Sequence, residues 1–368
     1  MKTRFLIPIF FTIMTASAQN KVNLLVGTYT NSCDSKGIYV YEFDTATADV
    51  KLKATSDKII NPSYLTVSPD RKKVWAVNED GAKSGVTSFA FDAKKGTLKT
   101  LNSQETLGAD PCFIMNDKGN VITANYSGGS ISVFKNQPDG KLDKACQIVT
   151  HEGHSMRKQQ KSPHMHQTQL APDKKFVIAN DLGTDRIYVY RYYPESEKQV
   201  LEFQDTIPVK TASGPRHLTF SPDGKSAYLL QELDGTLTAY HYAEGKFSRF
   251  QETTVVNPDS KSDASAADIH ISQDGKFLYA TNRGDANTIT TFSVGTNGRL
   301  SLIETIATGG KGPRNFTLSP DGNFVLVAHQ YSNDVIIFKR DKLTGKLTDS
   351  GKKIALCSPV CLVFAPQD

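Results

Sequence analysis

Short apolar runs recur along the chain at intervals of about 50 residues, and a tight turn follows each of them. The turns share the pattern Ser-Pro-Asp-Gly or a variant of it: SPDR at 68–71, NDKG at 116–119, APDK at 171–174, SPDG at 221–224, SQDG at 272–275 and SPDG at 319–322. Pro and Asp favour the first positions of a tight turn, and Gly accepts the positive φ that ends it. Because a second apolar run follows each turn, the pattern predicts a series of β-hairpins.

Two further runs complete each repeat. A third apolar run ends in an aromatic residue, as in SFAFD at 88–92 and VIIFK at 335–339, and a Gly-x-Leu-like signal usually opens a fourth stretch. No stretch has a convincing helical spacing of apolar residues. A unit of four strand-like runs at this period is typical of a β-propeller blade, so the sequence predicts an all-β protein.

Seven inner runs can be counted, at 64–67, 113–115, 167–170, 217–220, 269–271, 315–318 and 361–364. The run VNLLVGTY at 22–29 matches a second strand of the repeat, and its missing inner partner is the last run, SPVCLVFAP at 358–366. The final strand is therefore expected to complete the N-terminal blade, which closes the ring and removes an open edge. We predict a single seven-bladed β-propeller domain over residues 19–368, with four antiparallel strands per blade; the regular spacing argues against a β-sandwich or two stacked domains.

Composition narrows the class of protein. The 368 residues are 38% hydrophobic and 22% charged, with a formal net charge of +5, which is typical of a soluble globular chain. No block of Lys or Arg is dense enough to suggest a nucleic-acid partner. We expect a monomer that needs no cofactor and does not span a membrane.

The N-terminus has the features of a signal peptide. Lys2 and Arg4 precede an apolar run from Phe5 to Met14, and Ala16-Ser17-Ala18 has the small-x-small pattern of a cleavage site. The apolar run is too short to cross a bilayer, which needs about 20 residues. We therefore predict that residues 1–18 are removed and that the protein is exported, to the periplasm or the extracellular space.

The chain has five cysteines: Cys33, Cys112, Cys146, Cys357 and Cys361. Export makes disulfides possible, but the odd number and irregular spacing assign no pairing, and no C-x2-C metal motif occurs. At most two bridges can form, and most of these residues are expected to be buried as small apolar side chains.

The propeller pattern places two rings of residues on one face, around the central channel. The first ring lies at the start of each inner strand: Ser63, Cys112, His166, Arg216, Ala267, Arg314 and Val360. The second ring lies just past each second strand: Tyr29, Glu79, Tyr126, Asp181, Glu232, Arg283 and Gln330. Both ends lie opposite the tight turns, because antiparallel neighbours joined by a turn have their other ends together.

Charged and imidazole groups gather in one part of these rings. His166, Arg216, Glu232, Arg283 and Arg314 come from consecutive blades and should converge, while His164 lies two residues before His166 on the same side of an extended segment. We therefore predict catalytic roles for His164, His166, Arg216, Glu232 and Arg283, and substrate contacts for Arg314, Asp181, Asp268, His270, Tyr126 and Gln330. Ion pairs that hold neighbouring blades together are the alternative, but they leave cations in surplus, and surplus arginines indicate an anion site.

A metal site is the second alternative for the two histidines. His164-x-His166 on a strand could chelate a metal, yet no further ligand is clearly assigned, so we predict none. The preceding basic connection, 151–161, contains His151 and His154, and the sequence leaves open whether it covers the mouth or is a solvated loop. No nucleophile elbow, P-loop or dinucleotide fingerprint is found.

Several of these stretches resemble the seven-bladed lactonases, which include the propeller-type bacterial 6-phosphogluconolactonases and the fungal carboxymuconate-lactonising enzymes. The matching stretches are NYSGGSISVF at 125–134, PHMH at 163–166, GPRHLTFSPDG at 214–224, LLQE at 229–232, AADIHISQDGKFLYATNRG at 266–284 and GPRNFTLSPDG at 312–322. The resemblance covers essentially the whole mature chain. It implies lactone-opening or lactone-forming chemistry at the channel mouth, with the family's His, Arg, Glu and Arg on the PHMH pair, Arg216, Glu232 and Arg283.

Our hypothesis from the sequence is hydrolysis of a small anionic sugar-acid lactone, 6-phosphogluconolactonase-like. The arginines would bind the anion and the developing oxyanion, and a His of the pair or Glu232 would deprotonate water, with His favoured. The chain departs from the family pattern in two respects. The familiar 6-phosphogluconolactone role is cytosolic, whereas this chain is predicted to be exported, which bears on the phosphosugar substrate. In addition, His329-Gln330 stands where relatives often have Asn-Gln. Two alternatives stay open: an exported propeller that binds a protein or glycan partner without catalysis, and a cycloisomerase that closes a lactone with the same residues.

Overall fold

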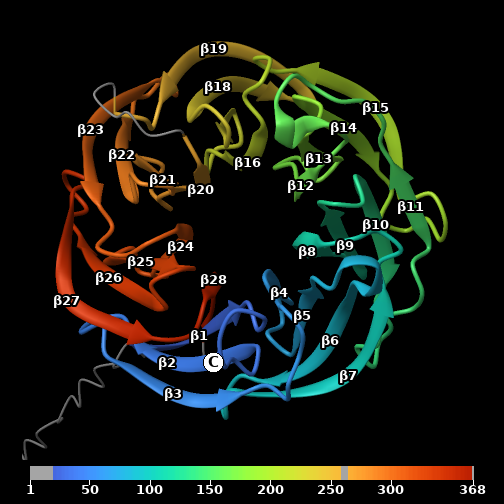
Figure 1. Cartoon of the computed structure of the whole chain (residues 1–368), viewed down its shortest axis with the longest axis horizontal. Coiled ribbons are helices and arrows are strands. Elements are labelled where there is room, and N and C mark those ends of the chain that lie inside the picture. The colour runs from blue at the N-terminus through green and yellow to red at the C-terminus, as the bar shows by residue number, and fades with distance from the viewer. Residues whose placement is uncertain (1–19, 258–263, 367–368) are drawn as a thin grey trace, which may run out of the picture.

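Seven four-stranded antiparallel sheets form a closed ring around a central channel (Figure 1). The structure is a computed structural model, and it describes residues 20–257 and 264–366. The predicted signal peptide lies outside these residues. The sequence repeat corresponds to one sheet in every case, so the prediction of a seven-bladed propeller is confirmed.

The blades are numbered along the chain and their strands run from the channel outwards. Blade 1 contains β28 (Pro359–Pro366), β1 (Lys21–Thr28), β2 (Ile38–Asp44) and β3 (Val50–Thr55); blade 2 contains β4 (Leu65–Val67), β5 (Lys73–Asn78), β6 (Gly85–Asp92) and β7 (Thr97–Glu105); blade 3 contains β8 (Pro111–Asp117), β9 (Asn120–Asn125), β10 (Ser130–Lys135) and β11 (Gln147–Thr150).

The remaining blades follow the same order. Blade 4 contains β12 (Met165–Leu170), β13 (Phe176–Asp181), β14 (Arg186–Tyr192) and β15 (Leu201–Pro208); blade 5 contains β16 (Pro215–Phe220), β17 (Ser226–Gln231), β18 (Thr236–Ala243) and β19 (Lys246–Thr254); blade 6 contains β20 (Ala266–Ile271), β21 (Phe277–Asn282), β22 (Thr288–Val294) and β23 (Leu300–Ala307); blade 7 contains β24 (Pro313–Leu318), β25 (Phe324–His329), β26 (Asp334–Arg340) and β27 (Leu347–Ala355). Two short 3-10 helices, η1 (Gly81–Lys83) and η2 (Lys158–Gln160), lie in connections.

The tight turns form as the sequence predicts. In the turn between β16 and β17, the Gly224 N–H donates to the Ser221 carbonyl oxygen at 2.8 Å, and the Ser221 hydroxyl donates to the Asp223 carboxylate at 2.6 Å. The Ser226 N–H in turn donates to the Ser221 hydroxyl oxygen at 2.9 Å. These local bonds set the hairpin register, which decides the face that each side chain occupies.

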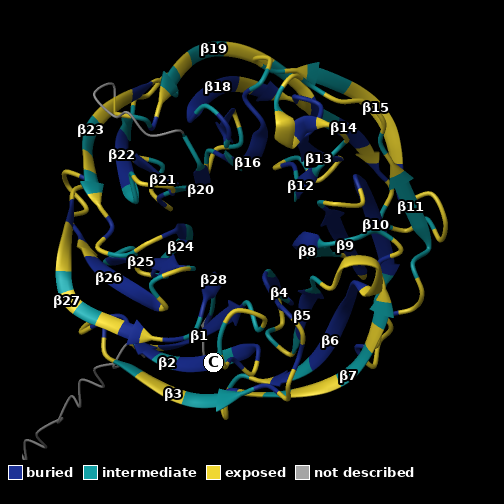
Figure 2. Cartoon of the chain, viewed as in Figure 1, coloured by how far each residue is buried: buried dark blue, intermediate teal, exposed yellow. Residues whose placement is uncertain are grey.

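The core lies between neighbouring blades. Ile178 and Val189 of blade 4, for example, pack in one buried cluster with Leu218 and Leu229 of blade 5. The inner strands are largely buried, whereas the outermost strands carry most of the exposed positions (Figure 2). Each sheet buries its apolar residues against the next sheet, so the ring is the arrangement in which no blade lacks a partner.

The ring closes between the two ends of the chain. β28 pairs antiparallel with β1, from Val22 opposite Pro366 to Thr28 opposite Pro359, as the sequence predicts (Figure 1). A disulfide between Cys33 and Cys357, a pairing that the sequence left open, ties the β1–β2 connection to the segment before β28. Cys112, Cys146 and Cys361 are free thiols.

Candidate active site

A cavity of about 280 Å³ lies at the mouth of the channel, and each of the seven blades contributes to it. It is lined by Tyr29, Glu79, Asp110, Cys112, Tyr126, Ser127, His166, Arg216, Glu232, Arg283 and Arg314. Most of these residues belong to the two rings that the sequence repeat predicts. Their convergence from stretches far apart in the chain follows from the circular arrangement of the blades.

β-bulges at the mouth end of four inner strands position the first ring. The pairing of inner and second strands skips one residue in each case: Cys112 in β8, His166 in β12, Arg216 in β16 and Arg314 in β24. All four of these residues line the cavity. A bulge leaves its extra residue out of the ladder and re-aims its side chain. The bulges therefore explain how an inner strand presents a functional side chain to the mouth.

The Gly-Pro-Arg motif of blade 5 builds one such bulge. Gly214 has a φ of +67°, and a Cβ at this position would lie only 2.7 Å from the Leu233 side chain, so a larger residue would be strained and crowded. The Gly214 N–H donates to the Asp185 carboxylate at 2.8 Å. The Pro215 nitrogen has no hydrogen to donate to the ladder, which suits the irregular start of the strand. Arg216 follows directly and reaches the cavity.

Arg216, Glu232 and Arg283 form a buried ion-pair network. Arg216 Nη1 lies 2.5 Å from one Glu232 carboxylate oxygen, and Arg283 Nη2 lies 3.0 Å from the other. Burial alone would raise the pKa of Glu232, but the two guanidinium groups outweigh it and lower the pKa to about 2. Glu232 is thus an anchor for the arginines and a weak base.

Main-chain carbonyls fix the two arginines further. Arg216 Nε donates to the Ala267 carbonyl oxygen at 2.7 Å, and Arg283 Nε donates to that of Ser265 at 3.1 Å. Within the described part of the chain, each arginine keeps one group free of hydrogen bonds: Nη1 of Arg283 and Nη2 of Arg216. Both arginines line the cavity with a free Nη group, and Arg216 also holds His166 and Glu232 in place.

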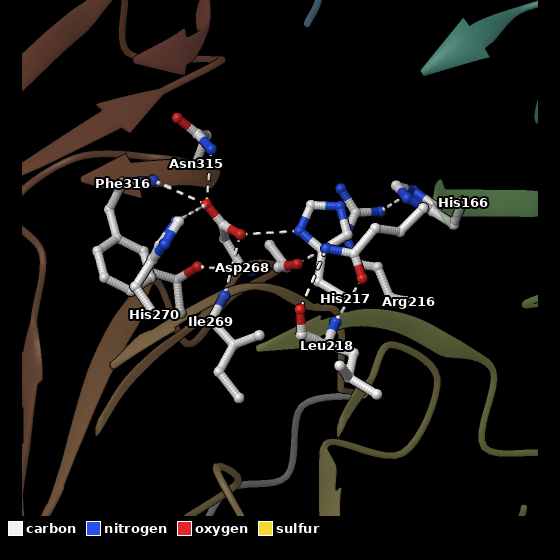
Figure 3. Close-up of polar contacts among 12 residues, drawn as sticks. His166, Arg216, His217, Leu218, Asp268, Ile269, His270, Asn315 and Phe316 are labelled. Atoms are coloured by element: carbon white, nitrogen blue, oxygen red, sulfur yellow. Dashed lines mark hydrogen bonds and ion pairs between the residues drawn. The ribbon is translucent and has the colours of Figure 1, made fainter. Parts of the chain in front are cut away.

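His166 is a neutral imidazole. Its Nε2 atom accepts a hydrogen bond from Arg216 Nη1, which requires an unprotonated Nε2 (Figure 3). Burial and the positive charge of Arg216 hold its pKa well below the usual value. The lone pair that a general base would use is therefore occupied.

Arg314 is the cation of the cavity that has no ion pair. Among the residues that the structure describes, its guanidinium forms no hydrogen bond and no ion pair, and it lies over the Tyr29 ring, 5.4 Å from the ring centre. Burial alone would lower its pKa, but the surrounding Tyr29 and Glu79 groups raise it above the usual value. Arg314 is thus a permanent positive charge that faces the cavity without a bound counter-charge.

Glu79 lies at the end of β5, at the same ring position as Glu232. The Ser63 hydroxyl and the Tyr29 hydroxyl both donate to its carboxylate. The sequence repeat places Glu79 in the second ring and assigns no role to it. Its ring position, shared with Glu232, was the signal that could have identified it.

Two residues predicted for the site lie beside the cavity. The His164 ring stacks on the Tyr126 ring with ring centres 4.4 Å apart, and its Nδ1–H donates to the Tyr126 carbonyl oxygen at 3.0 Å. His164 therefore helps to hold Tyr126 in position. Asp181 accepts hydrogen bonds from the His164 and Gly183 N–H groups and the Thr184 hydroxyl. Because its oxygens are committed to the loop, Asp181 organises the backbone near the site.

Gln330 lines an adjoining polar depression of about 470 Å³, which shares Tyr29, Glu79 and Asp110 with the mouth cavity. Asp268 and His270 instead line a separate cavity of about 370 Å³ within the central channel. Their bulged strand, β20, places Ala267 at the ring position and turns the two following polar side chains along the channel. We expected them at the mouth, and the structure places them deeper.

Asp268 is the centre of a buried polar network below the mouth (Figure 3). One oxygen lies 2.8 Å from His217 Nδ1; the other lies 3.0 Å from His270 Nε2 and accepts from the Asn315 side chain at 2.6 Å. His217 also packs edge-on against His166, with ring centres 5.1 Å apart. The network therefore supports the floor of the site, and His217 is a residue that the sequence reasoning missed.

The basic connection before β12 is held against blades 4 and 5. Ser155 donates to the Asp185 carboxylate at 2.5 Å, Gln160 donates to the same carboxylate at 2.8 Å, and Arg157 Nε donates to the Ala212 carbonyl oxygen at 2.8 Å. None of these residues lines the mouth cavity. The connection buttresses the loop that carries Gly214.

Residues 20–257 and 264–366 contain neither a candidate membrane span nor a candidate metal cluster. No helix there has the length and apolar character that crossing a membrane requires. Over the same residues, no three His, Cys, Asp or Glu side chains come together in an arrangement suited to a metal ion. His164 and His166 have separate partners, Tyr126 and Arg216.

The chain is similar in sequence and in structure to proteins of one family. The family model described as "Lactonase, 7-bladed beta-propeller" matches residues 23–364. The 6-phosphogluconolactonase of Formosa agariphila is 36% identical over 332 residues, which are 88% of this chain and 94% of that protein; that of Bacillus subtilis is 32% identical over 347 residues, 93% and 98%. The solved structure of the periplasmic gluconolactonase PpgL of Pseudomonas aeruginosa superposes with a TM-score of 0.91 at 36% identity, over 95% of this chain and all of that one.

Proposed function

The chain belongs to the seven-bladed β-propeller lactonase family, and we propose that it hydrolyses a small anionic sugar-acid lactone at the mouth cavity. The observation that carries the proposal is the unpaired guanidinium of Arg314, which faces the cavity close to Arg283 and Arg216. A partly buried cation without a counter-charge favours an anionic ligand. The names of the relatives, 6-phosphogluconolactonase and gluconolactonase, suggest the substrate class.

The arginines would bind the substrate and stabilise the negative charge that forms during ring opening. Arg314 and the free Nη1 group of Arg283 would hold the anionic group of the substrate and the carbonyl oxygen, which becomes negative as water attacks the ring carbonyl. Arg216, Glu232 and His166 would keep these donors in place through the ion-pair network. No covalent intermediate is required, because a lactone already reacts with water.

The first test is a substrate panel. Proton release would be followed with δ-gluconolactone, its 6-phosphorylated analogue and a carboxylated lactone, each against its spontaneous rate in buffer. We expect the anionic lactones to be opened with a higher kcat/KM than the neutral one. Arg249→Ala, a change at an exposed arginine of β19, serves as the matched control and should leave the rates unchanged. Failure to accelerate any lactone would contradict the proposal.

Isotopic labelling separates hydrolysis from cycloisomerisation. A hydrolase introduces one oxygen atom from labelled water into the product carboxylate, whereas a cycloisomerase forms or opens its lactone without solvent oxygen. We expect one labelled oxygen per turnover, and its absence would identify an isomerase. A propeller that only binds a partner would form no product from the lactone, labelled or unlabelled.

We also propose that the protein is exported. The signal-peptide pattern at 1–18, the Cys33–Cys357 disulfide and the periplasmic relative support this proposal. Mass spectrometry of the protein from its source cells should give a chain that begins near Gln19 and lacks two thiol hydrogens. A chain that keeps Met1 and carries five free thiols would contradict export.

A further inference from the structure

The carboxylates that line the mouth cavity have different surroundings. Glu232 is paired with two arginines, and Asp110 accepts the Gly81 N–H at 2.9 Å at the rim. Glu79, in contrast, has no cationic nitrogen within ion-pair distance anywhere in the described chain. It is the carboxylate of this cavity that is held by two neutral hydroxyl groups.

The contacts of Glu79 orient it and leave it basic. The Ser63 hydroxyl donates to Oε1, and the Tyr29 hydroxyl donates to Oε2 at 3.1 Å. The main chain is fixed as well, because the Asn61 amide donates to the Glu79 carbonyl oxygen at 2.8 Å. Burial raises the pKa of Glu79 above the usual value, and the more distant Arg314 offsets this only in part. A carboxylate with a raised pKa is a better proton acceptor at neutral pH.

The two candidate bases that the sequence indicated, His166 and Glu232, are occupied. His166 Nε2 accepts from Arg216, and both Glu232 oxygens are bound by guanidinium groups, with a pKa of about 2. Neither has a free lone pair of useful basicity at the cavity. Any water that attacks a bound lactone needs a different proton acceptor.

The placement of Glu79 suits that role. Glu79 comes from blade 2, whereas Arg216, Arg283 and Arg314 come from blades 5, 6 and 7, so Glu79 and the three arginines are contributed by different parts of the ring. The ring of Tyr29 lies under Arg314 while its hydroxyl contacts Glu79, so one side chain links the two parts. A lactone whose carbonyl oxygen faces the arginines exposes its carbonyl carbon to water on the Glu79 side.

We infer that Glu79 is the catalytic proton acceptor of the ring opening, an inference that rests on the lactonase function proposed above. The water oxygen bonds to the carbonyl carbon while one water proton passes to a Glu79 oxygen, and the carbonyl electron pair moves onto the oxygen that faces the arginines. As the tetrahedral intermediate collapses, the bond between the carbonyl carbon and the ring oxygen breaks. The leaving oxygen takes the proton from Glu79, which gives the open hydroxy acid and restores the carboxylate.

The decisive experiment compares Glu79→Gln with the wild-type protein on the best lactone of the panel. Gln can accept one of the two hydroxyl hydrogen bonds through its oxygen and can donate to the other hydroxyl through its amide group, but it cannot take a proton at neutral pH. General-base catalysis typically contributes 10²–10⁴-fold, so we expect kcat to fall about 100-fold with KM changed less than about threefold. The isosteric control is Glu105→Gln at the exposed end of β7, which should retain full activity and stability.

The pH dependence gives an independent readout. The wild-type rate should fall on the acid side with a midpoint above that of an ordinary glutamate, because protonated Glu79 is inactive, and Glu79→Gln should lose this limb. Tyr29→Phe removes the hydroxyl that stabilises the carboxylate, so its acid limb should move to higher pH while the ring under Arg314 is kept.

Several outcomes would overturn the inference. It fails, while the lactonase function stands, if Glu79→Gln keeps the wild-type kcat and pH profile, or if Asp110→Asn removes the acid limb and Glu79→Gln does not. If Glu79→Gln does not fold, the Tyr29→Phe variant provides the test. A pH–rate profile of Tyr29→Phe whose acid-side midpoint equals that of the wild type contradicts the role of Glu79. A wild-type protein that opens no lactone overturns both the inference and the proposed function.

Discussion

Arg216 Nη1 donates hydrogen bonds to both His166 and Glu232, so a single guanidinium nitrogen links the two residues. It requires a neutral His166 with Nε2 as acceptor and stabilises the carboxylate form of Glu232. Two residues that the sequence marks as candidate bases thus become structural partners of an arginine. The base and the free cation must then be sought elsewhere in the cavity, and Glu79 and Arg314 are two of its charged groups that have no ion pair within the described chain.

His166 can be tested as an acceptor for Arg216 by two substitutions. A Gln side chain can offer its oxygen to Arg216, so His166→Gln should keep kcat/KM within about tenfold of the wild-type value. His166→Leu leaves the Arg216 donor unsatisfied, at a cost of about 1–3 kcal/mol, and should lose about 10- to 100-fold. Steady-state kinetics distinguish the roles: if His166 were itself the base, both variants would lose activity equally.

Glu232→Gln should destabilise the fold. It leaves Arg216 and Arg283 buried without a counter-charge, and the loss of one partner of a buried pair costs about 3–5 kcal/mol. Urea unfolding followed by circular dichroism measures the change, with Glu105→Gln as the exposed control within about 0.5 kcal/mol of wild type. A Glu232→Gln protein as stable as the control would show that the network contributes little.

Arg314→Ala should affect binding more than stability. The guanidinium has no ion pair to lose, so Tm should stay the same or rise, whereas KM for an anionic lactone should increase about 10- to 100-fold, the value of a charged hydrogen bond. Arg314→Lys should recover part of the affinity, and neutral δ-gluconolactone should be less affected. An unchanged KM for the anionic substrate would place its binding elsewhere.

Reduction of the Cys33–Cys357 disulfide should weaken ring closure. The bridge joins residues 324 positions apart, and removal of such a cross-link typically costs about 2–4 kcal/mol. A Cys33→Ser/Cys357→Ser protein should unfold at lower urea concentration than wild type, and a reducing agent should lower wild-type stability to the same level. Cys146→Ser, at a free thiol, is the control; a reducing agent without effect would contradict the expectation.

His217 should make the fold sensitive to mild acid. Burial lowers its pKa to about 4, despite the contact with Asp268, against about 6.5 in an unfolded chain. Between these values the unfolded state binds more protons than the native state, so the free energy of unfolding should decrease as the pH falls from 6.5 to 4, by at most about 1.4 kcal/mol per pH unit.

His217→Asn keeps a donor toward Asp268 without a titrating ring, so its stability should decline less steeply over this range. His270, whose pKa Asp268 raises against burial, contributes with the opposite sign and remains in both proteins. Urea unfolding at intervals of half a pH unit measures the slopes, and equal slopes would exclude His217 as the source.

The architecture was predictable because its determinants are local. Turns such as Ser221–Gly224 and the alternation of apolar residues set each hairpin, and seven repeats with a displaced last strand leave ring closure as the way to pair every edge. Ring positions followed from strand order, which identified Arg216, Glu232, Arg283 and Arg314 as residues of the mouth. The Gly-Pro-Arg motif was visible in the sequence, although the bulge that it builds was not.

The sequence by itself therefore determined the propeller, its closure and the set of polar residues near the channel mouth. Only the tertiary structure decided which arginine lacks an ion pair, that Asp268 and His270 lie in the channel, that Cys33 meets Cys357, and that Glu79 faces the cavity with neutral partners. The reason is physical: strand and turn formation depends on neighbours in the chain, whereas pairing, burial and pKa depend on atoms that different blades bring together.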